Sequence, residues 1–422
     1  MISRFLLLVL CWCLTTTLPA TPQHVFLMRE AAEAAKAGDH AAALAKLEAA
    51  AALRPDYPRL QLNLARTYAA LDRPADALAA LQRLADMGQQ TKVSGDAAFA
   101  ALQDSAEFKA LAAQLLKGPA LPPAGDPAFT LPGVDGIIES ILFDPGSQTW
   151  FFGDVRNRCI WQRDSGGALR RFTAEEDALD GVFKLELSPD RKTLWASTAT
   201  VGAMTGADAE DGKRSTLVGL DLATGRVRDR FPVTKKGVKH LLGDFVIADD
   251  GAIYATDSVY QAVWRLQPDA KDAEFEVWIE NKEFMNLQGL AFGDGGSNLY
   301  VADYANGIWR IDVATKTPVL LTAPPNSSFF GIDGIYAVGG NLLAIQNGVT
   351  PQRVLRIAPA ADGPSQASVV AIGRSAMNDL ALGTIVNGQL HFVGNSGWAL
   401  FDPAPETPPA ARTVTIYSIP AE

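Results

Sequence analysis

Two kinds of hydrophobic pattern divide the chain. Between residues 24 and 117, Ala and Leu recur every three or four positions, which predicts amphipathic helices. Beyond residue 127, short apolar runs alternate with polar positions and are separated by Gly- and Asp-rich turns, which predicts β-hairpins. The sequence therefore predicts an α plus all-β protein, with a small helical part followed by a larger strand-rich part.

Four hairpin patterns in the strand-rich part repeat one another. Each opens on a small or polar residue and ends its second strand on an Asp or Asn, at Asp257, Asp303, Asn347 and Asn395. The spacing of about 45 residues is typical of a propeller blade. We count six blades, whose inner strands open near Ile138, Phe183, Gly243, Gln288, Asp333 and Asn378. Because the inner strands of a propeller surround one channel, these openers are expected to converge on a single pocket.

Three blades carry a Trp at the same place in the third strand, at Trp161, Trp264 and Trp309. We expect these rings to pack between blades, and we expect Asp257 and Asp303 to hold the blade turns. The last predicted strand, 413–419, is expected to pair with the first blade, because a closed ring leaves no exposed sheet edge.

The helical segment, 21–117, resembles tetratricopeptide repeats. The Gly38-Asp39 turn and Pro55 have the spacing of one repeat, and Leu64 and Tyr68 have the spacing of the next. Two repeats are fewer than a free-standing solenoid needs, so we expect this domain to lean on the propeller or on a protein partner. A Pro- and Gly-rich linker, 118–127, separates it from the propeller at 128–422.

Residues 1–20 have the pattern of a secretory signal peptide. Arg4 is followed by an apolar run from Phe5 to Leu14 and by Ala20 at the expected cleavage point. This pattern predicts a periplasmic or secreted protein. Cleavage would leave Cys159 as the remaining cysteine, so no intramolecular disulfide is expected, and no later stretch has the pattern of a membrane span.

Charge argues against nucleic acid as a partner. The net charge is −10, and its acidic excess lies in the propeller, because the helical segment is neutral. An acidic surface repels phosphates and attracts cations.

No established catalytic motif stands out along the chain. The nucleophile elbow, the zinc helix, the phosphate loop and the dinucleotide fingerprint are all absent, and the four histidines are scattered. What remains is carboxylates and amides that the fold brings together, and such oxygen ligands suit calcium or magnesium.

The blade motifs resemble the senescence marker protein/gluconolactonase family of six-bladed propellers. The matching phrases begin at Glu139 (ESILF), Leu287 (LQGLAF) and Ile332 (IDGI), and the resemblance covers most of 137–419. It implies a divalent cation, with calcium as the expected ion, held by Glu139, by Asp333 and by Gln288, which replaces the family's Asn. It also implies hydrolysis of a sugar lactone, with Asp333 or Asp244 taking the proton of the attacking water.

Two departures from the family pattern leave a second hypothesis open. Gln288 has one methylene more than Asn, and Gly243 stands where the family has a second Asn. A non-catalytic module that senses a ligand in the channel, or a scaffold that binds a protein through the helical groove, fits these changes equally well.

The remaining candidate residues are basic. Lys184 and His240 are expected to face the channel and to bind the substrate. Lys184 is also a rival to the cation, because it could neutralise Glu139 and Asp333 by itself. The insertion 200–215 is expected to emerge on the opener face, as a cover for the pocket or as a loose acidic loop.

Overall fold

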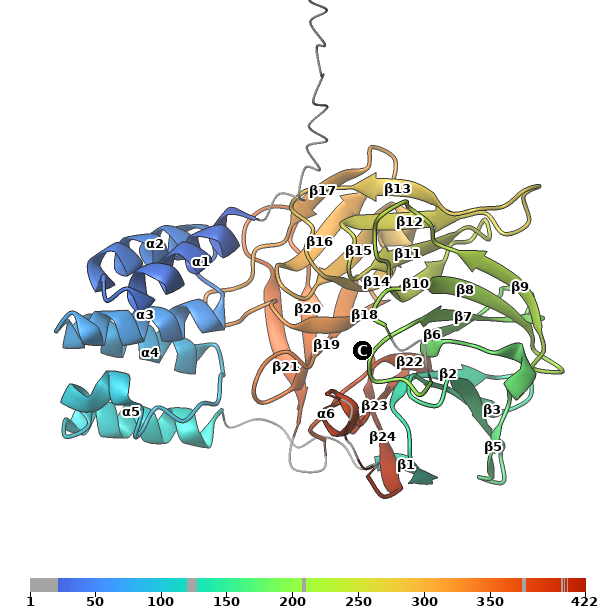
Figure 1. Ribbon diagram of the computed structural model, residues 1–422, viewed down its shortest axis with the longest axis horizontal. Coiled ribbons are helices and arrows are strands. Elements are labelled where there is room, and N and C mark those ends of the chain that lie inside the picture. The colour runs from blue at the N-terminus through green and yellow to red at the C-terminus, as the bar shows by residue number, and fades with distance from the viewer. Residues whose placement is uncertain are drawn as a thin grey trace, which may run out of the picture.

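The computed structural model describes residues 22–119, 127–206, 210–373, 377–403, 405, 407 and 409–422. A stack of helices lies beside a ring of six β-sheets (Figure 1). The predicted signal peptide and most of the predicted linker lie outside the described residues. The α plus all-β class, with a helical region followed by a six-bladed propeller, is confirmed.

The helical domain consists of two helical hairpins and a final short pair. Its elements are α1 (Gln23–Lys36), α2 (His40–Leu53), α3 (Pro58–Ala70), α4 (Pro74–Asp86), the 3₁₀-helix η1 (Ala97–Leu102) and α5 (Ala106–Lys117). Asp39 caps α2 by accepting a hydrogen bond from the Ala42 backbone N–H at 2.9 Å, and prolines begin α3 and α4. Buried alanines such as Ala43 and Ala50 allow close packing of the helices. No helix among the described residues is long and apolar enough to cross a membrane.

The six blades are four-stranded antiparallel sheets. Blade 1 consists of β2 (Ile138–Asp144), β3 (Thr149–Asp154), β4 (Cys159–Arg163) and β5 (Leu169–Arg171). Blade 2 consists of β6 (Gly181–Leu187), β7 (Thr193–Ala199), β8 (Ser215–Asp221) and β9 (Val227–Pro232). Blade 3 consists of β10 (Leu242–Ile247), β11 (Ile253–Asp257), β12 (Ala262–Leu266) and β13 (Glu276–Glu280).

Blade 4 consists of β14 (Leu287–Gly293), β15 (Asn298–Asp303), β16 (Gly307–Asp312) and β17 (Thr317–Leu320). Blade 5 consists of β18 (Ile332–Val338), β19 (Asn341–Gln346), β20 (Arg353–Ala358) and β21 (Gln366–Ile372). Blade 6 consists of β22 (Gly383–Val386), β23 (Gln389–Val393), β24 (Arg412–Pro420) and β1 (Pro127–Val134). The short helices η2 (Glu175–Asp177), η3 (Asp294–Gly296) and α6 (Trp398–Phe401) lie in the connections.

The ring closes differently from the expectation. The last strand, β24, does not pair with blade 1; it pairs with β23 and with β1, so the first propeller strand becomes the outer strand of the last blade. This arrangement joins both ends of the propeller sequence in one sheet, which holds the ring shut by main-chain hydrogen bonds.

A hydrophobic cluster fills the space between each pair of neighbouring blades. Trp264 and Trp309 belong to two of these clusters and Trp161 packs against a third, so the predicted place of these rings between blades is confirmed. The predicted role of the strand-end aspartates is confirmed as well. Asp303, for example, accepts hydrogen bonds from the Trp309 indole at 3.2 Å and from the Met285 backbone N–H at 3.0 Å.

The helical domain is fixed to the propeller by an arginine from each side. The Arg54 guanidinium, after α2, lies 2.5 Å from Asn306 Oδ1, and Tyr57 stacks on Phe330 with ring centroids 4.0 Å apart. In the other direction, the buried Arg353 of β20 donates to the carbonyl oxygens of Met87 and Gly88 at 3.0 and 3.3 Å. The expectation that the helices lean on the propeller is therefore confirmed.

Candidate functional site

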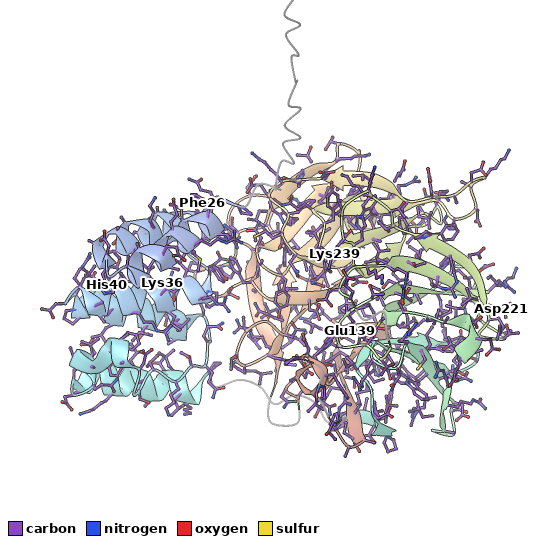
Figure 2. All side chains as sticks on the ribbon, viewed as in Figure 1. Phe26, Lys36, His40, Glu139, Asp221 and Lys239 are labelled. Atoms are coloured by element: carbon purple, nitrogen blue, oxygen red, sulfur yellow. The ribbon has the colours of Figure 1, made fainter. Side chains whose placement is uncertain are left out.

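A β-bulge opens the inner strand of five blades. In four of them the pairing between the first and second strands shifts register after the first matched residue, and in blade 2 it shifts after the second. Such a shift turns a side chain out of the sheet, here toward the channel. The residues at the shifts are Glu139, Phe183, Gly243, Gln288 and Asp333, and all five line one cavity. Figure 2 shows Glu139 toward the middle of the ring, whereas Asp221 lies at its rim.

This cavity, which we call the acidic pocket, has a volume of about 480 Å³. Four carboxylates line it, together with amide side chains and no Lys, Arg or His among the described residues. Its remaining principal lining residues are Asp244, Ser258, Asn286, Tyr304, Asn347, Gln352, Asp379 and Trp398. The pocket is therefore a site of concentrated negative charge without a basic side chain in its wall.

Glu139 is buried and Asp333 is half-buried, and both carboxyl groups line the acidic pocket. Burial raises the pKa of Glu139 well above its usual value, and the Asp333 carboxylate raises it further, while a hydrogen bond from the Trp398 indole opposes the shift. Burial, and then Asp244, raise the pKa of Asp333 to about 7. Crowded carboxylates with raised pKa values bind either protons or a cation.

Lys184 is paired with Asp244 and not with Glu139 or Asp333, although its charge also lowers the pKa of Asp333. Its Nζ lies 3.3 Å from Asp244 Oδ1. Phe183, and not Lys184, occupies the bulge position of blade 2 and lines the acidic pocket. Burial alone would lower the pKa of Lys184, but the Asp244 carboxylate raises it above its usual value. Burial raises the pKa of Asp244, and the ion pair with Lys184 opposes this shift. The short distance between the two groups and the raised pKa of Lys184 indicate that both groups are charged.

We expected Lys184 to lie in the acidic pocket, and this expectation is wrong. Phe183, one residue earlier in the strand, takes that position. Lys184 lines a different cavity of about 900 Å³, which also includes Glu186 and is formed by the opposite ends of the inner strands. The channel thus has two mouths, and the ion pair between Lys184 and Asp244 lies between them.

The expectation that His240 binds the substrate is not supported by its position. The ring is buried, its Nδ1 lies 2.7 Å from Asp257 Oδ2, and it packs edge-on against Tyr260 and Trp264. His240 is not a lining residue of the acidic pocket. It precedes the inner strand of blade 3 and is drawn into the turn that Asp257 holds.

The insertion 200–215 does reach the opener face. Val201, Ala203 and Met204 are buried in one cluster with Phe183 and with Phe401 of α6. Because Phe183 lines the acidic pocket, this part of the insertion supports the wall of the pocket. Residues 207–209, at its middle, lie outside the described residues.

Gln288 lies in the acidic pocket with its amide held from two sides. Its Nε2 donates to Asn286 Oδ1 at 2.5 Å, and its Oε1 lies 3.4 Å from Ser258 Oγ. The amide oxygen therefore lies beside Gly243 and shares that space with the Ser258 hydroxyl.

Among the described residues, no three His, Cys, Asp or Glu side chains are grouped so that they alone could hold a metal ion. A cation here would need amide oxygens as well as carboxylates. One such oxygen is present: Asn347 Oδ1 is buried without a hydrogen-bond partner, while its Nδ2 donates to Asp333 Oδ2 at 2.8 Å. An unpaired amide oxygen beside a carboxylate fits an oxygen-ligated cation.

Several lining residues were not among the candidates from the sequence. Asn347 ends a blade phrase where blades 3 and 4 have Asp257 and Asp303, and this difference was the available signal. Asp379 follows the opener Asn378, and its Oδ2 accepts from the Gly397 backbone N–H at 2.8 Å. Tyr304 and Trp398 come from connections whose path the repeat pattern does not predict.

Comparison with known proteins finds a family match in the helical half of the chain. A family model described as tetratricopeptide repeat matches residues 34–104. No curated protein matches the sequence. Among solved structures, a gluconolactonase from Xanthomonas campestris is 16% identical with a TM-score of 0.48, covering 71% of this chain and 99% of that one.

Other propellers are similarly distant. A structure of glucose dehydrogenase is 12% identical with a TM-score of 0.47, covering 70% of this chain and 100% of that one. Virginiamycin B lyase from Staphylococcus aureus is 13% identical with a TM-score of 0.41, covering 69% of this chain and 99% of that one. The chain thus consists of a helical domain, in which residues 34–104 match the tetratricopeptide-repeat model, followed by a six-bladed propeller.

Proposed function

We propose that the acidic pocket binds a divalent cation together with a small polar ligand, and that the protein hydrolyses a cyclic ester of the sugar-lactone type. The observation that carries this proposal is the lining of the pocket: four carboxylates, several amides and no basic side chain among the described residues. Binding of a cation would relieve the repulsion that raises the pKa of Glu139 and Asp333. The blade phrases at Glu139 and Asp333, which resemble gluconolactonases, support the same assignment.

The ligands of the cation would be Glu139, Asp333 and amide oxygens from Gln288 and Asn347. Calcium suits this set, because it accepts six to eight oxygen ligands in flexible geometry. When bound, such a cation would supply Lewis acidity toward an ester carbonyl.

Asp333 is the better candidate for the proton acceptor. Its carboxyl group lines the pocket beside the other proposed ligands and could take a proton from the attacking water. Water would add to the ester carbonyl, the ring C–O bond would break, and the ring oxygen would leave with a proton to give the open hydroxy acid. Asp244 is less suited, because its Oδ1 already accepts from the Phe245 backbone N–H at 2.7 Å and pairs with Lys184.

The test combines metal binding with turnover. Calcium at 100 times its dissociation constant should stabilise the protein by about 2.7 kcal/mol. Asp333→Ala should abolish this stabilisation. It should also abolish the hydrolysis of an aldonolactone, which is measured by the acid that the reaction releases. Asp362→Ala, at an exposed loop position, should change neither. The absence of a calcium shift in the unmodified protein would refute the proposed site.

A second candidate is ligand binding without turnover. It is favoured by Phe183, an apolar ring at a bulge position where other blades present Glu, Gln or Asp. In that case calcium would stabilise the protein but no aldonolactone would be hydrolysed. A protein partner would then bind through the helical domain.

We further propose that the protein is exported, on the basis of the pattern in residues 1–20. Mass spectrometry of the protein from its native cell should find a mature start near Thr21. An intact Met1 on cytoplasmic protein would contradict this.

A further inference from the structure

A second cavity lies between the helical domain and the propeller. It has a volume of about 440 Å³, and both domains contribute to its wall. We call it the interdomain cleft. Its apolar lining residues are Tyr57, Pro58, Leu62, Leu84, Phe330 and Val349.

Tyr304 connects the interdomain cleft with the acidic pocket, because it lines both cavities. On one side, burial raises the pKa of its phenol to about 12, and the carboxylates of Asp333, Asp379 and Glu139 add to the shift. On the other side, its ring lies against Gly348, where an added Cβ atom would come within 2.7 Å of the phenol oxygen. The two cavities are therefore neighbours, with this ring as the wall that they share.

The walls of the cleft are fixed before any ligand arrives. Tyr57 is held by its stack on Phe330, and the Arg54 guanidinium lies 4.2 Å from the centroid of the same ring. The backbone N–H of Gln90 donates to the Thr350 carbonyl oxygen at 2.6 Å across the domain boundary. A preformed cavity costs little ordering free energy when it is filled.

The polar groups of the cleft are largely occupied by protein partners. The Gln90 side chain donates to the Leu116 carbonyl oxygen at 2.8 Å, and the Gln89 side chain donates to the Met87 carbonyl oxygen at 3.3 Å. Arg59, which is exposed, and Thr91 also line the cleft, so the surface left for a ligand combines these polar groups with an aliphatic and aromatic wall.

We propose that the interdomain cleft is the second half of the ligand site, and that it receives an alkyl or acyl substituent of a molecule whose polar ring lies in the acidic pocket. This inference rests on the proposed function of the acidic pocket and adds a substrate class to it: cyclic esters with an apolar chain. The helical domain thereby becomes part of the binding site, through Tyr57 and Leu62.

The experiment compares a γ-lactone that carries an octyl chain with one that carries a methyl group, in the presence of calcium. Calorimetry on the full protein should show tenfold or tighter binding of the octyl lactone, because each buried methylene contributes about 0.8 kcal/mol. Leu62→Gln, on the helical wall, and Val349→Gln, on the propeller wall, should each reduce the ratio of the two affinities by about tenfold.

Leu78→Gln is the matched control for the helical wall. Leu78 is also a partly buried leucine that packs on the helical core, but it does not line the cleft, so the ratio should stay unchanged. Equal affinity for both lactones, a ratio that neither cleft variant lowers, or no binding of either lactone would overturn the inference.

Calcium-dependent stabilisation separates this inference from the proposed function. Calcium binding without a preference for the long chain would leave the acidic pocket standing and reject the cleft. Chain-length-dependent binding without any effect of calcium would support the cleft and reject the cation site.

Discussion

Gly243 leaves the space that the amide of Gln288 uses. A Cβ atom on Gly243 would lie 3.1 Å from Gln288 Oε1 and 2.6 Å from Ser258 Oγ, which is closer than such atoms normally approach. The two positions that depart from the gluconolactonase pattern are therefore neighbours in space. The missing side chain of one accommodates the longer side chain of the other, so both changes belong to one rearrangement of the pocket wall.

Gly243→Ala should accordingly weaken calcium binding. The new methyl group would displace Ser258 and the Gln288 amide, and we expect about a tenfold loss of calcium affinity, equivalent to about 1.4 kcal/mol. Titration calorimetry with calcium measures this loss. Ser258→Ala in the same chain removes the closer of the two contacts and should recover part of the affinity.

An unchanged affinity in Gly243→Ala would contradict the role of Gln288. The melting temperature without calcium controls for damage to the fold. Gly251→Ala is unsuitable as a comparison, because Gly251 has φ +82° and any side chain there is strained. Gly166 has no such constraint and lies outside the acidic pocket, so Gly166→Ala should leave calcium affinity unchanged.

Much of the fold was predictable because it depends on local periodicity. The helical repeat follows from Ala and Leu spacing, and the blades follow from hairpins with a strand-end Asp or Asn. The rings of Trp264 and Trp309 lie between blades as expected, because a repeated position in a repeated blade faces the same neighbour each time.

The register of the pocket was less predictable. A bulge shifts the channel-facing position by one residue, so Phe183 lines the acidic pocket while Lys184 pairs with Asp244. A bulge leaves little trace in a hydrophobic pattern, because the strand continues on both sides of it. Closure through β1 was missed because it joins segments at opposite ends of the propeller sequence.

Stability without calcium should fall as the pH rises. The pKa of Asp333 is about 7 in the folded protein and ordinarily 3.8, so the unfolded chain releases its proton first. Between about pH 4 and pH 7 the folded state is therefore progressively destabilised, and the loss levels off above this window. One pKa unit corresponds to about 1.36 kcal/mol, which limits the contribution of Asp333 to roughly 4 kcal/mol.

Urea unfolding at pH 5 and pH 8, with a chelator present, measures this decline. Asp333→Asn should remove most of it, and so should added calcium at pH 8, whereas Asp362→Asn should not. A stability that rises from pH 5 to pH 8 in the unmodified protein would show that these carboxyl groups are not held with raised pKa values.

Arg353→Ala should loosen the helical domain. Arg353 is 2% exposed, and its loss would leave the Gly88 carbonyl oxygen without its donor and the Met87 carbonyl oxygen with the longer bond from Gln89 alone. We expect a loss of about 2 to 3 kcal/mol, within the range for unsatisfied buried polar groups. Hydrogen exchange should become faster in α3 and α4, which measures detachment of the domain directly.

Arg356→Ala is the matched control on the same strand. Its guanidinium donates to the carbonyl oxygens of Ala421 and Pro420, at the end of the chain and not on the helices. Exchange in α3 and α4 should stay slow in this variant. Equal exchange rates in the two variants would mean that Arg353 does not hold the domains together.

Lys184→Met should destabilise the protein without weakening calcium binding. The substitution leaves the buried Asp244 carboxylate without its partner, and breaking a buried ion pair in this way typically costs 3 to 5 kcal/mol. The loss should be smaller at pH 5 than at pH 8, because burial raises the pKa of Asp244 and protonation removes its uncompensated charge.

Lys239→Met provides the comparison, since Lys239 pairs with Glu210 at 3.3 Å in an exposed position and should cost less than about 1 kcal/mol. The calcium-dependent stabilisation of the Lys184→Met variant shows which carboxyl groups Lys184 neutralises. If Lys184 acts mainly on Asp244, its removal changes the calcium affinity by less than about tenfold, because Lys184 pairs with Asp244 and has only a weaker electrostatic effect on Asp333. If removal of Lys184 instead makes calcium bind at least tenfold more tightly, the lysine competes with the cation for the acidic pocket, and the pairing with Asp244 does not describe its role in solution.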